Sequence, residues 1–157
     1  MGHAPLCSCG SGNAYAACCG PYIAGQAQPP TAEALMRSRY TAFAQRQLDY
    51  LIATHHPTQR HPDQRRTLAN SLAATTWLGL TVLKTSLGQP ADREGMVEFV
   101  AYYRDAELGQ VHERSRFVQQ KDRWFYLNGD QLPPLIPKGN ASCWCGSGKK
   151  FKACHGR

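Results

Sequence analysis

The sequence predicts an α+β protein, in which helices come first and an antiparallel sheet follows, with a cysteine-rich module at each end. Three observations support this fold class: apolar residues recur at helical spacing in the first third, β-forming residues dominate from residue 76 onward, and all seven cysteines lie near the two ends. Helices followed by consecutive strands favour a sheet with the helices on one face. The predicted divisions are a first module at 1–20, a linker at 21–30, a central domain at 31–131, a second linker at 132–141 and a second module at 142–157.

The helical part of the central domain has recognisable start and stop residues. Thr31 follows two prolines and is predicted to N-cap a single amphipathic helix over 32–55, which ends before Pro57. Asp63 is predicted to cap a second helix that runs to about Ala74. The connection between them contains three histidines that offer metal ligands, but their alternation with prolines favours a solvated loop. These histidines are His55, His56 and His61.

From residue 76 the sequence changes to the pattern of strands. The predicted strands are 76–87, 96–105, 110–120 and 124–127. A loop at 88–95, a turn at 106–109 and a tight turn at Lys121–Asp122 separate them, and Asn128–Gly129 is predicted to end the last strand. Four consecutive strands joined by short connections predict an antiparallel sheet.

A fourteen-residue pattern occurs twice, at residues 7–20 and again at 143–156. Eight of the fourteen positions are identical, and each copy contains four potential metal ligands in the order Cys-x-Cys-x8-Cys-[Cys/His]. The informative exchange is Cys19 for His155, because cysteine and histidine share little except the ability to bind a metal ion. A Gly-Ser-Gly turn follows the second cysteine of each copy and allows the chain to bring its two ligand pairs together.

This pattern predicts two tetrahedral zinc ions, one in each module. Four protein ligands close the coordination shell, which predicts a structural role and argues against a catalytic one. The odd number of cysteines and the adjacent Cys18 and Cys19 disfavour a disulfide framework, and the spacing and the Cys/His exchange favour zinc over redox thiols or an iron–sulfur cluster. The predicted ligands are Cys7, Cys9, Cys18, Cys19, Cys143, Cys145, Cys154 and His155.

The positive charge of the chain gathers at its end. The formal charge is +7, and the last twenty residues hold five basic side chains and no acidic one. Seven thiolates contribute −7 and two zinc ions +4, which leaves about +4 and weakens a nucleic-acid interpretation. The lysines of the second module either compensate the zinc–thiolate charge or contact a partner, and Trp144 either packs on the central domain or joins that contact. The predicted contact surface comprises Trp144, Lys149, Lys150 and Lys152.

Strand alternation predicts a candidate pocket on the inner face of the sheet. The register that turns the apolar residues of the strands inward also turns Glu113 and Ser115 toward the helices. A buried carboxylate requires compensation, and Arg37 or Arg39 on the long helix is the predicted partner. The alternatives are a structural ion pair, which is favoured, and an acid–base site with His112, although adjacent strand residues face opposite sides.

The second module resembles the SEC-C motif, the short zinc-binding segment at the extreme C-terminus of the bacterial SecA translocase. The matching residues are Cys143, Cys145, Gly146, Ser147, Gly148, Lys149, Lys150, Phe151, Cys154, His155 and Gly156. The first module departs from the motif, since Asn13 and Ala14 replace the lysine pair and Cys19 replaces the histidine.

Together with the segments 35–40 and 112–117, the double arrangement resembles the YchJ-like family of small bacterial SEC-C proteins. The resemblance covers nearly the whole chain. It implies an NTF2-like central domain, whose curved antiparallel sheet packs on a long helix and can leave a pocket. It implies no established activity.

These observations predict a cytoplasmic bacterial zinc protein that acts by binding. The chain shows no secretory signal and no apolar run long enough to cross a membrane. By its resemblance to the SecA tail, the second module is expected to act as an adaptor that docks on a protein partner or the ribosome. The alternative is a small-molecule-binding protein or enzyme that uses the central pocket. The central domain is expected to fold without either module.

Overall fold

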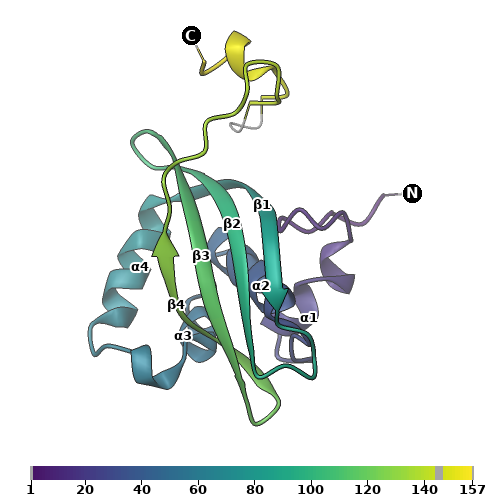
Figure 1. Cartoon of the computed structure of the whole chain (residues 1–157), viewed down its shortest axis with the longest axis vertical. Helices are drawn as coiled ribbons and strands as arrows, with labels where there is room; N and C mark the ends of the chain where they lie inside the picture. Colours follow the sequence, from purple (N-terminus) through teal and green to yellow (C-terminus); the bar gives the residue numbers. More distant parts are fainter. Residues whose placement is uncertain (1, 144–146, 157) are drawn as a thin grey trace.

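The computed structural model describes residues 2–143 and 147–156 and confirms the predicted α+β class (Figure 1). Helices come first and strands second. The helices and strands are α1 (Gly20–Ile23), α2 (Ala32–Ala44), α3 (Leu48–Thr54), α4 (Gln64–Ala74), β1 (Thr76–Leu87), β2 (Glu94–Arg104), β3 (Leu108–Gln120) and β4 (Arg123–Gln131). The described residues also include the short 3₁₀ helices η1 (Tyr15–Ala17), η2 (Pro57–Gln59) and η3 (Phe151–Ala153).

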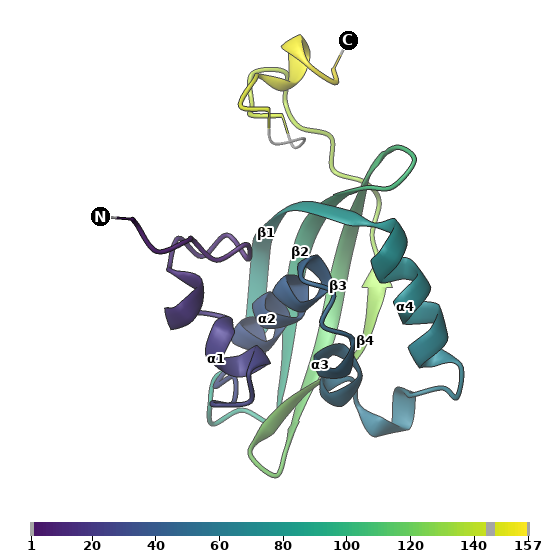
Figure 2. The same cartoon turned by 180° about the vertical axis from the view of Figure 1, so that it is seen from behind.

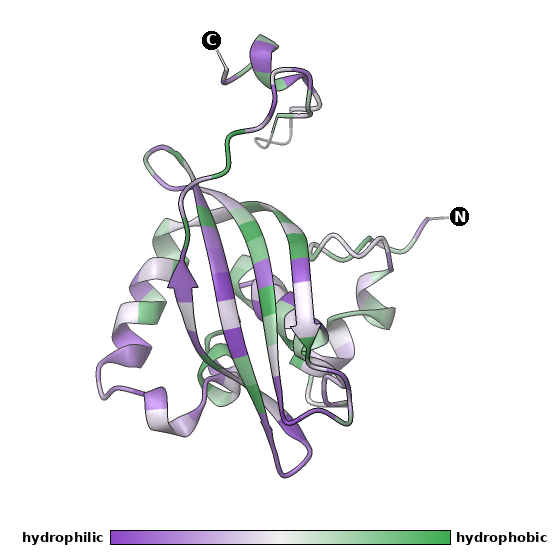
Figure 3. Ribbon diagram, viewed as in Figure 1, coloured by the Kyte–Doolittle hydropathy of each residue, from purple (hydrophilic) through white to green (hydrophobic). Residues whose placement is uncertain are grey.

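The four strands form an antiparallel sheet in the order β1-β2-β3-β4. Lys121 and Asp122 both have positive φ angles, 52° and 59°, as the predicted tight turn between β3 and β4 requires. Figures 1 and 2 show α2 and α3 against one face of the sheet, which curves around α2. Figure 3 shows hydrophobic residues in the middle of β2 and a mainly hydrophilic stretch along β3. Burial alternates in β3, where Ser115 and Phe117 are buried and Arg114 and Arg116 are exposed, as expected of a strand whose two faces differ.

The predicted single helix over 32–55 is wrong, because the chain breaks it into α2 and α3. Thr31 caps α2 as predicted, since its hydroxyl accepts a hydrogen bond from the amide of Ala34 (3.0 Å). The break follows from a helix-ending motif in which Arg46 takes a left-handed conformation (φ 60°) and the Gln47 amide donates to the Ala42 carbonyl (2.8 Å). Glycine usually marks this position, and none stands here.

The predicted bounds of α4 are confirmed, with Asp63 at its N-cap position, but the predicted side-chain cap is absent, and the end of β4 also differs from the prediction. The side chain of Asp63 makes no capping hydrogen bond to α4 and instead pairs with Arg66 (3.0 Å). The strand β4 continues through Asn128–Gly129 to Gln131. Gly129 lies directly above the carboxyl group of Glu113, where a Cβ atom would overlap that group, so this glycine provides room in a strand instead of marking a turn.

The main core joins α2, the inner face of the sheet and the first cysteine module. Leu35 of α2 and Phe117 of β3 are almost completely buried, and Cys7, Cys9 and Cys19 belong to the same cluster. Arg37 reinforces the contact by donating a hydrogen bond to the Cys9 carbonyl (2.7 Å). The first module therefore supplies part of the core. Whether the central domain folds without it stays a prediction, and this packing predicts a loss of stability when the module is removed.

The second linker begins as a strap across the outer face of the sheet. The Leu132 amide donates to the carbonyl of His112, and the His112 ring donates through Nδ1 to the Pro133 carbonyl (2.7 Å). Gln110 exchanges two side-chain hydrogen bonds with the backbone of Leu135 (2.7 and 2.9 Å). Only the later residues of this linker leave the sheet (Figure 1).

Within the described parts of the chain, no helix combines the length and apolarity that a membrane span requires.

Candidate functional site

Four cysteines of the first module converge on one point. The Sγ atoms of Cys7, Cys9, Cys18 and Cys19 all lie within 4.8 Å of one another, with Cys9 3.6 Å from Cys18 and Cys18 3.9 Å from Cys19. A tetrahedral ion with Zn–S bonds of roughly 2.3 Å would separate its sulfur ligands by about 3.8 Å. The four thiols therefore fit a metal ion of this kind, and the distances are too long for disulfide bonds.

Their electrostatics also point to a cation. The neighbouring Cys19 thiol lowers the pKa of Cys9 to about 4, and the same contact raises the pKa of Cys19. Burial raises the pKa of Cys18. The opposite directions at Cys9 and Cys19 show that neighbouring thiolates disfavour one another in this cluster, and a bound divalent cation would relieve that repulsion.

A small backbone framework presents these ligands. Gly12 has a positive φ of 82°, and the Ser11 hydroxyl accepts a hydrogen bond from the Asn13 amide (3.2 Å). The Cys7 amide donates to the Asn13 carbonyl (2.8 Å), which folds the first ligand pair back over η1 and so toward Cys18. The Gly-Ser-Gly turn thus has the role that the sequence predicted for it.

The second module repeats this framework. The Cys143 amide donates to the Lys149 carbonyl (2.7 Å), and η3 presents the last two ligands as η1 does. The Sγ atoms of Cys143 and Cys154 each lie 3.2 Å from Nδ1 of His155, and the three ligand atoms lie within 4.8 Å of one another. Two residues assigned to this module by the sequence, Trp144 and Cys145, lie outside the described residues.

Each copy of the fourteen-residue pattern ends in a glycine, and in both copies a larger residue would clash with the aromatic residue five positions earlier. A Cβ atom at Gly20 would lie 2.9 Å from the Tyr15 carbonyl oxygen, and one at Gly156 would lie 2.9 Å from that of Phe151. Both aromatic rings pack directly under their glycine. The exchange of Tyr15 for Phe151 therefore preserves a structural contact, as the exchange of Cys19 for His155 preserves a potential ligand.

The two modules differ in how they are seated. The first contributes to the core, and Tyr15 donates a hydrogen bond to Gln45 at the end of α2 (3.1 Å). The second stands apart from the sheet (Figures 1 and 2), and a hydrogen bond from the Phe151 amide to the Ala141 carbonyl (2.8 Å) links it to the end of the linker that precedes it. The side chains of Lys149, Lys150 and Lys152 are exposed.

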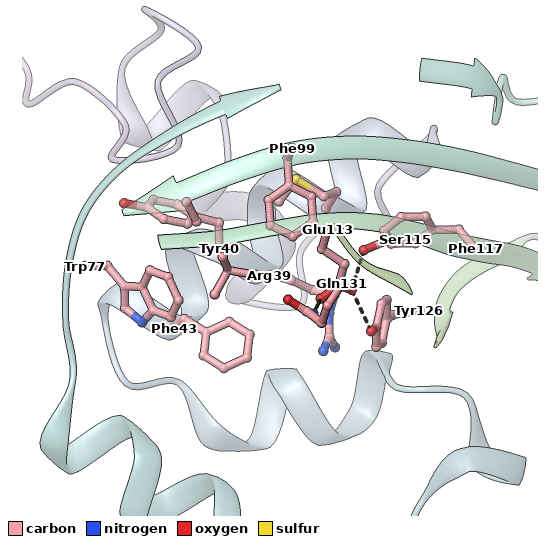
Figure 4. Close-up of a pocket in the computed structure, with 13 residues that line it drawn as sticks. Arg39, Tyr40, Phe43, Trp77, Phe99, Glu113, Ser115, Phe117, Tyr126 and Gln131 are labelled. Carbon is pink, nitrogen blue, oxygen red and sulfur yellow. Dashed lines mark hydrogen bonds between the residues drawn. The ribbon is translucent and has the colours of Figure 1, made fainter. Parts of the chain in front are cut away.

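A cavity of about 300 Å³ lies between α2 and the inner face of the sheet (Figure 4). Its walls are mostly aromatic, and its polar groups come from α2, β3 and β4. The aromatic residues are Tyr40, Phe43, Trp77, Phe99, Phe117 and Tyr126. The polar residues are Arg39, Glu113, Ser115 and Gln131. Three of the four candidate pocket residues therefore lie together, whereas Arg37 lies outside this cavity and pairs with Glu33 (3.1 Å).

The predicted ion pair between Glu113 and an arginine of the long helix is wrong. One carboxyl oxygen of Glu113 accepts from Ser115 (2.7 Å) and Tyr126 (2.8 Å), and the other accepts from Gln131 (2.6 Å). The guanidinium of Arg39 instead lies over the ring of Tyr126, 4.8 Å from its centroid. Neutral hydrogen-bond donors replace the expected cation, which is a common way to satisfy a half-buried carboxylate.

Sequence reasoning missed Tyr126 and Gln131, because strand alternation would place them on opposite faces. The pairing of β3 with β4 shifts by one residue between Arg116 and Phe117, so that Ser115 pairs with Gly129 but Phe117 pairs with Tyr126. This bulge on β4 turns both missed residues toward the cavity. A glycine in a strand was the available signal of irregularity.

The histidines take no part in the cavity. His112 lies on the outer face of the sheet, where Nε2 contacts Glu98 (3.0 Å), so it forms no acid–base pair with Glu113. The expected solvated loop is wrong for His56, which is buried and contacts Gln120 (3.0 Å), while His61 is exposed. His55 packs against the ring of Tyr126 with a centroid distance of 5.4 Å.

Comparisons with known proteins agree with this architecture. Residues 31–129 match the family described as "YchJ, middle NTF2-like domain", and residues 140–157 match the SEC-C motif. A UPF0225 protein of Serratia proteamaculans is 47% identical over 97% of this chain and 98% of its own length. A UPF0225 protein of Yersinia pestis is 44% identical over the same shares.

Two solved structures of SEC-C motif containing proteins are also similar. One from Rhodopseudomonas palustris has a TM-score of 0.73 and 35% identity, over 81% of this chain and 98% of that one. One from Psychrobacter arcticus has a TM-score of 0.64 and 31% identity, over 96% and 94%. With its NTF2-like middle domain and a Cys/His cluster that could bind a metal ion at each end, the chain belongs to the YchJ family of SEC-C motif proteins.

Proposed function

We propose that the protein binds two zinc ions and that its two modules have divided their roles. The first ion stabilises the core, and the second holds a docking module that binds a protein partner or the ribosome. The observation that carries this proposal is the unequal seating of two nearly identical frameworks. Cys7, Cys9 and Cys19 are buried in the core, whereas the second module stands clear of the sheet with three exposed lysines.

The choice of zinc rests on the ligands. Thiolates with one imidazole suit zinc, and the sulfur spacing in the first cluster agrees with zinc–sulfur bond lengths. Elemental analysis of protein purified without chelator should give two zinc ions per chain. A stoichiometry of one, or mass spectrometry showing oxidised cysteine pairs, would contradict this part of the proposal.

The docking role rests on exposure and charge. Replacing Lys149, Lys150 and Lys152 together by Gln should preserve zinc binding, because none is a ligand, and should weaken binding in a salt-dependent way. The assays are co-sedimentation with purified bacterial ribosomes and capture of protein partners from cell extract at several salt concentrations.

A matched control removes the same charge elsewhere. Gln at the exposed Lys84, Arg93 and Lys121 leaves the second module intact and should bind like wild type. If both triple variants lose binding equally, net charge is responsible and no docking surface exists. If neither loses binding, the three lysines of the module only compensate the charge of the zinc–thiolate cluster.

A further inference from the structure

The cavity between α2 and the sheet has one apolar and one polar end (Figure 4). At the apolar end Trp77 packs edge-on against Tyr40 and at a tilt against Phe43, with centroid distances of 5.8 Å in both cases. At the polar end Arg39 and Glu113 approach from opposite walls. A volume of about 300 Å³ is at the lower limit of ligand pockets, so the cavity has room only for a small molecule.

The two charged groups of the cavity are not equally satisfied. Glu113 accepts three hydrogen bonds, from Ser115, Tyr126 and Gln131. A carboxylate with this many donors is stable without a cation.

Arg39 lacks an equivalent set of hydrogen-bond partners. Its Nη1 atom donates to the Leu51 carbonyl (2.8 Å) and to the Thr54 hydroxyl (2.6 Å), and both acceptors are neutral. In the described part of the chain, its Nε and Nη2 atoms have no hydrogen-bond acceptor, and no carboxylate lies within ion-pair distance of it. Neither nitrogen is sealed in the interior, since no fully buried polar side-chain atom lacks a partner there.

The partly buried position of Arg39 makes its positive charge less favourable than it would be in water. Burial is the main cause that lowers the pKa of Arg39, to about 10, although the nearby Tyr126, Tyr50 and Glu113 partly offset it. The guanidinium is still protonated at neutral pH. A half-buried cation with open donors and no ion-pair partner gains most from an anion that enters the cavity.

We propose that this cavity binds a small organic acid, whose flat apolar body lies among the aromatic residues and whose carboxylate accepts hydrogen bonds from Arg39. The aromatic walls favour a ring through offset and edge-to-face contacts. A carboxylate matches the fork of an arginine side chain. An amine is disfavoured, because it would meet a cation while the carboxylate of Glu113 already has three donors. The inference is independent of the metal ions and of the docking role.

Three probes with one common body test the charge preference: phenylacetate, phenylacetamide and phenethylamine. Each is titrated into the full-length, metal-loaded protein at pH 7, and binding is followed by the NMR signal of the Trp77 indole N–H. Phenylacetate should bind about tenfold more tightly than the amide, and the amine most weakly. Equal affinities, a preference for the amine, or no shift of the Trp77 signal by any probe at millimolar concentration would overturn the proposal.

Variants then locate the contact. Arg39→Gln should remove the preference for the acid over the amide. The measured quantity is the ratio of the two affinities, because a general loosening of the pocket would weaken both ligands alike and leave this ratio unchanged. The exposed Arg93→Gln is the matched control and should keep the ratio. Glu113→Gln should tighten binding of the acid by a few-fold, since it removes a nearby negative charge. If the acid-to-amide affinity ratio is unchanged in Arg39→Gln, Arg39 does not bind the carboxylate and the proposal is overturned.

A second variant covers the case in which Arg39→Gln does not fold, because that side chain also ties α2 to α3. Ala101 lines the apolar end and is buried, so Ala101→Leu should fill part of the cavity without touching Arg39. This substitution should weaken the binding of phenylacetate and of phenylacetamide to the same degree, roughly tenfold. Unchanged affinity for both would place the binding site outside the cavity and overturn the proposal.

Discussion

At the scale of single residues, Glu113 shows how a carboxylate is held on the inner face of a sheet by neutral donors. Its hydroxyl donors come from Ser115 on the same strand and from Tyr126 on β4. Burial is the main cause that raises the pKa of Tyr126, and the negative charge of Glu113 adds to it, so this hydroxyl remains a donor at all physiological pH values. The link from Arg39 to Glu113 therefore passes through a tyrosine ring instead of an ion pair.

Glu113 and Tyr126 should be energetically coupled. The changes Glu113→Gln and Tyr126→Phe should each cost roughly 1–2 kcal/mol, because each leaves a partner without its hydrogen bond. In the double variant the costs should fall short of the sum by at least about 0.5 kcal/mol. Urea unfolding measures all three. Glu113→Gln combined with Arg37→Met is the control cycle and should be additive, because Arg37 lies outside the cavity.

A second residue makes stability depend on pH. Burial, aided by the charges of Arg39 and Arg60, lowers the pKa of His55 to about 4, and Gln64 donates to its Nδ1 atom. The folded state thus prefers neutral histidine. Its contribution to stability is complete above the unfolded pKa of about 6.5 and is lost as the pH falls toward about 4.

The variant His55→Asn should therefore lose less stability than wild type between pH 6.5 and pH 4. The measurement is the free energy of unfolding at several pH values in that interval. Both proteins can lose metal in this range, so the difference between them is the quantity that reports on His55. Parallel pH profiles would show that His55 does not titrate in this way.

At the scale of elements, the break between α2 and α3 positions Arg39 at the polar end of the cavity. It ends α2 after Ala44, and α3 then lies where the Leu51 carbonyl and Thr54 can accept hydrogen bonds from Arg39. An uninterrupted helix would carry these acceptors away from Arg39. The motif at Arg46 thus links a local backbone conformation to the polar end of the cavity.

Arg46→Gly should stabilise the protein by about 0.5–1 kcal/mol, because glycine adopts the left-handed conformation without the steric cost that Arg46 incurs at φ 60°. Thermal and urea unfolding measure the change. The matched control is Ala44→Gly, within the last turn of α2, which should destabilise by a similar amount. Destabilisation by Arg46→Gly would mean that the arginine side chain itself supports the break.

At the scale of the whole molecule, one cysteine module belongs to the core and the other is appended to it. Removing residues 1–19 should lower the melting temperature strongly or abolish cooperative melting, since Cys7, Cys9 and Cys19 belong to the main core. Removing residues 138–157 should shift it by less than about 4 °C, the effect of roughly 1 kcal/mol in a domain of this size. Differential scanning calorimetry of both truncated proteins measures the two changes in melting temperature. Equal changes would contradict the different roles assigned to the two modules.

The fold class followed from local rules, and the site followed only in part. The helix cap at Thr31 and the turn at Lys121–Asp122 could be predicted, because their side-chain and backbone preferences act within a few residues. The ligand pattern is equally local. Ser115 was predicted to lie beside Glu113, but Tyr126 and Gln131 could not be predicted as its partners, since their placement depends on a one-residue bulge opposite Arg116 and Phe117 that reverses strand alternation. Likewise, Arg46 occupies a position that most chains give to glycine.

The strap across the outer face of the sheet limits how far the second module can reach. Gln110 holds the chain at Leu135, and the module's own hydrogen bonds resume at Lys138. Only Ile136 and Pro137 lie between these two points, and proline has a fixed φ, so the fully extended connection from Leu135 to Lys138 spans about 10 Å. A molecule that engages Lys149 and its neighbours is therefore brought against the end of the sheet where β2 turns into β3 (Figure 1). A partner of the kind proposed would therefore have to accept the module and this edge together.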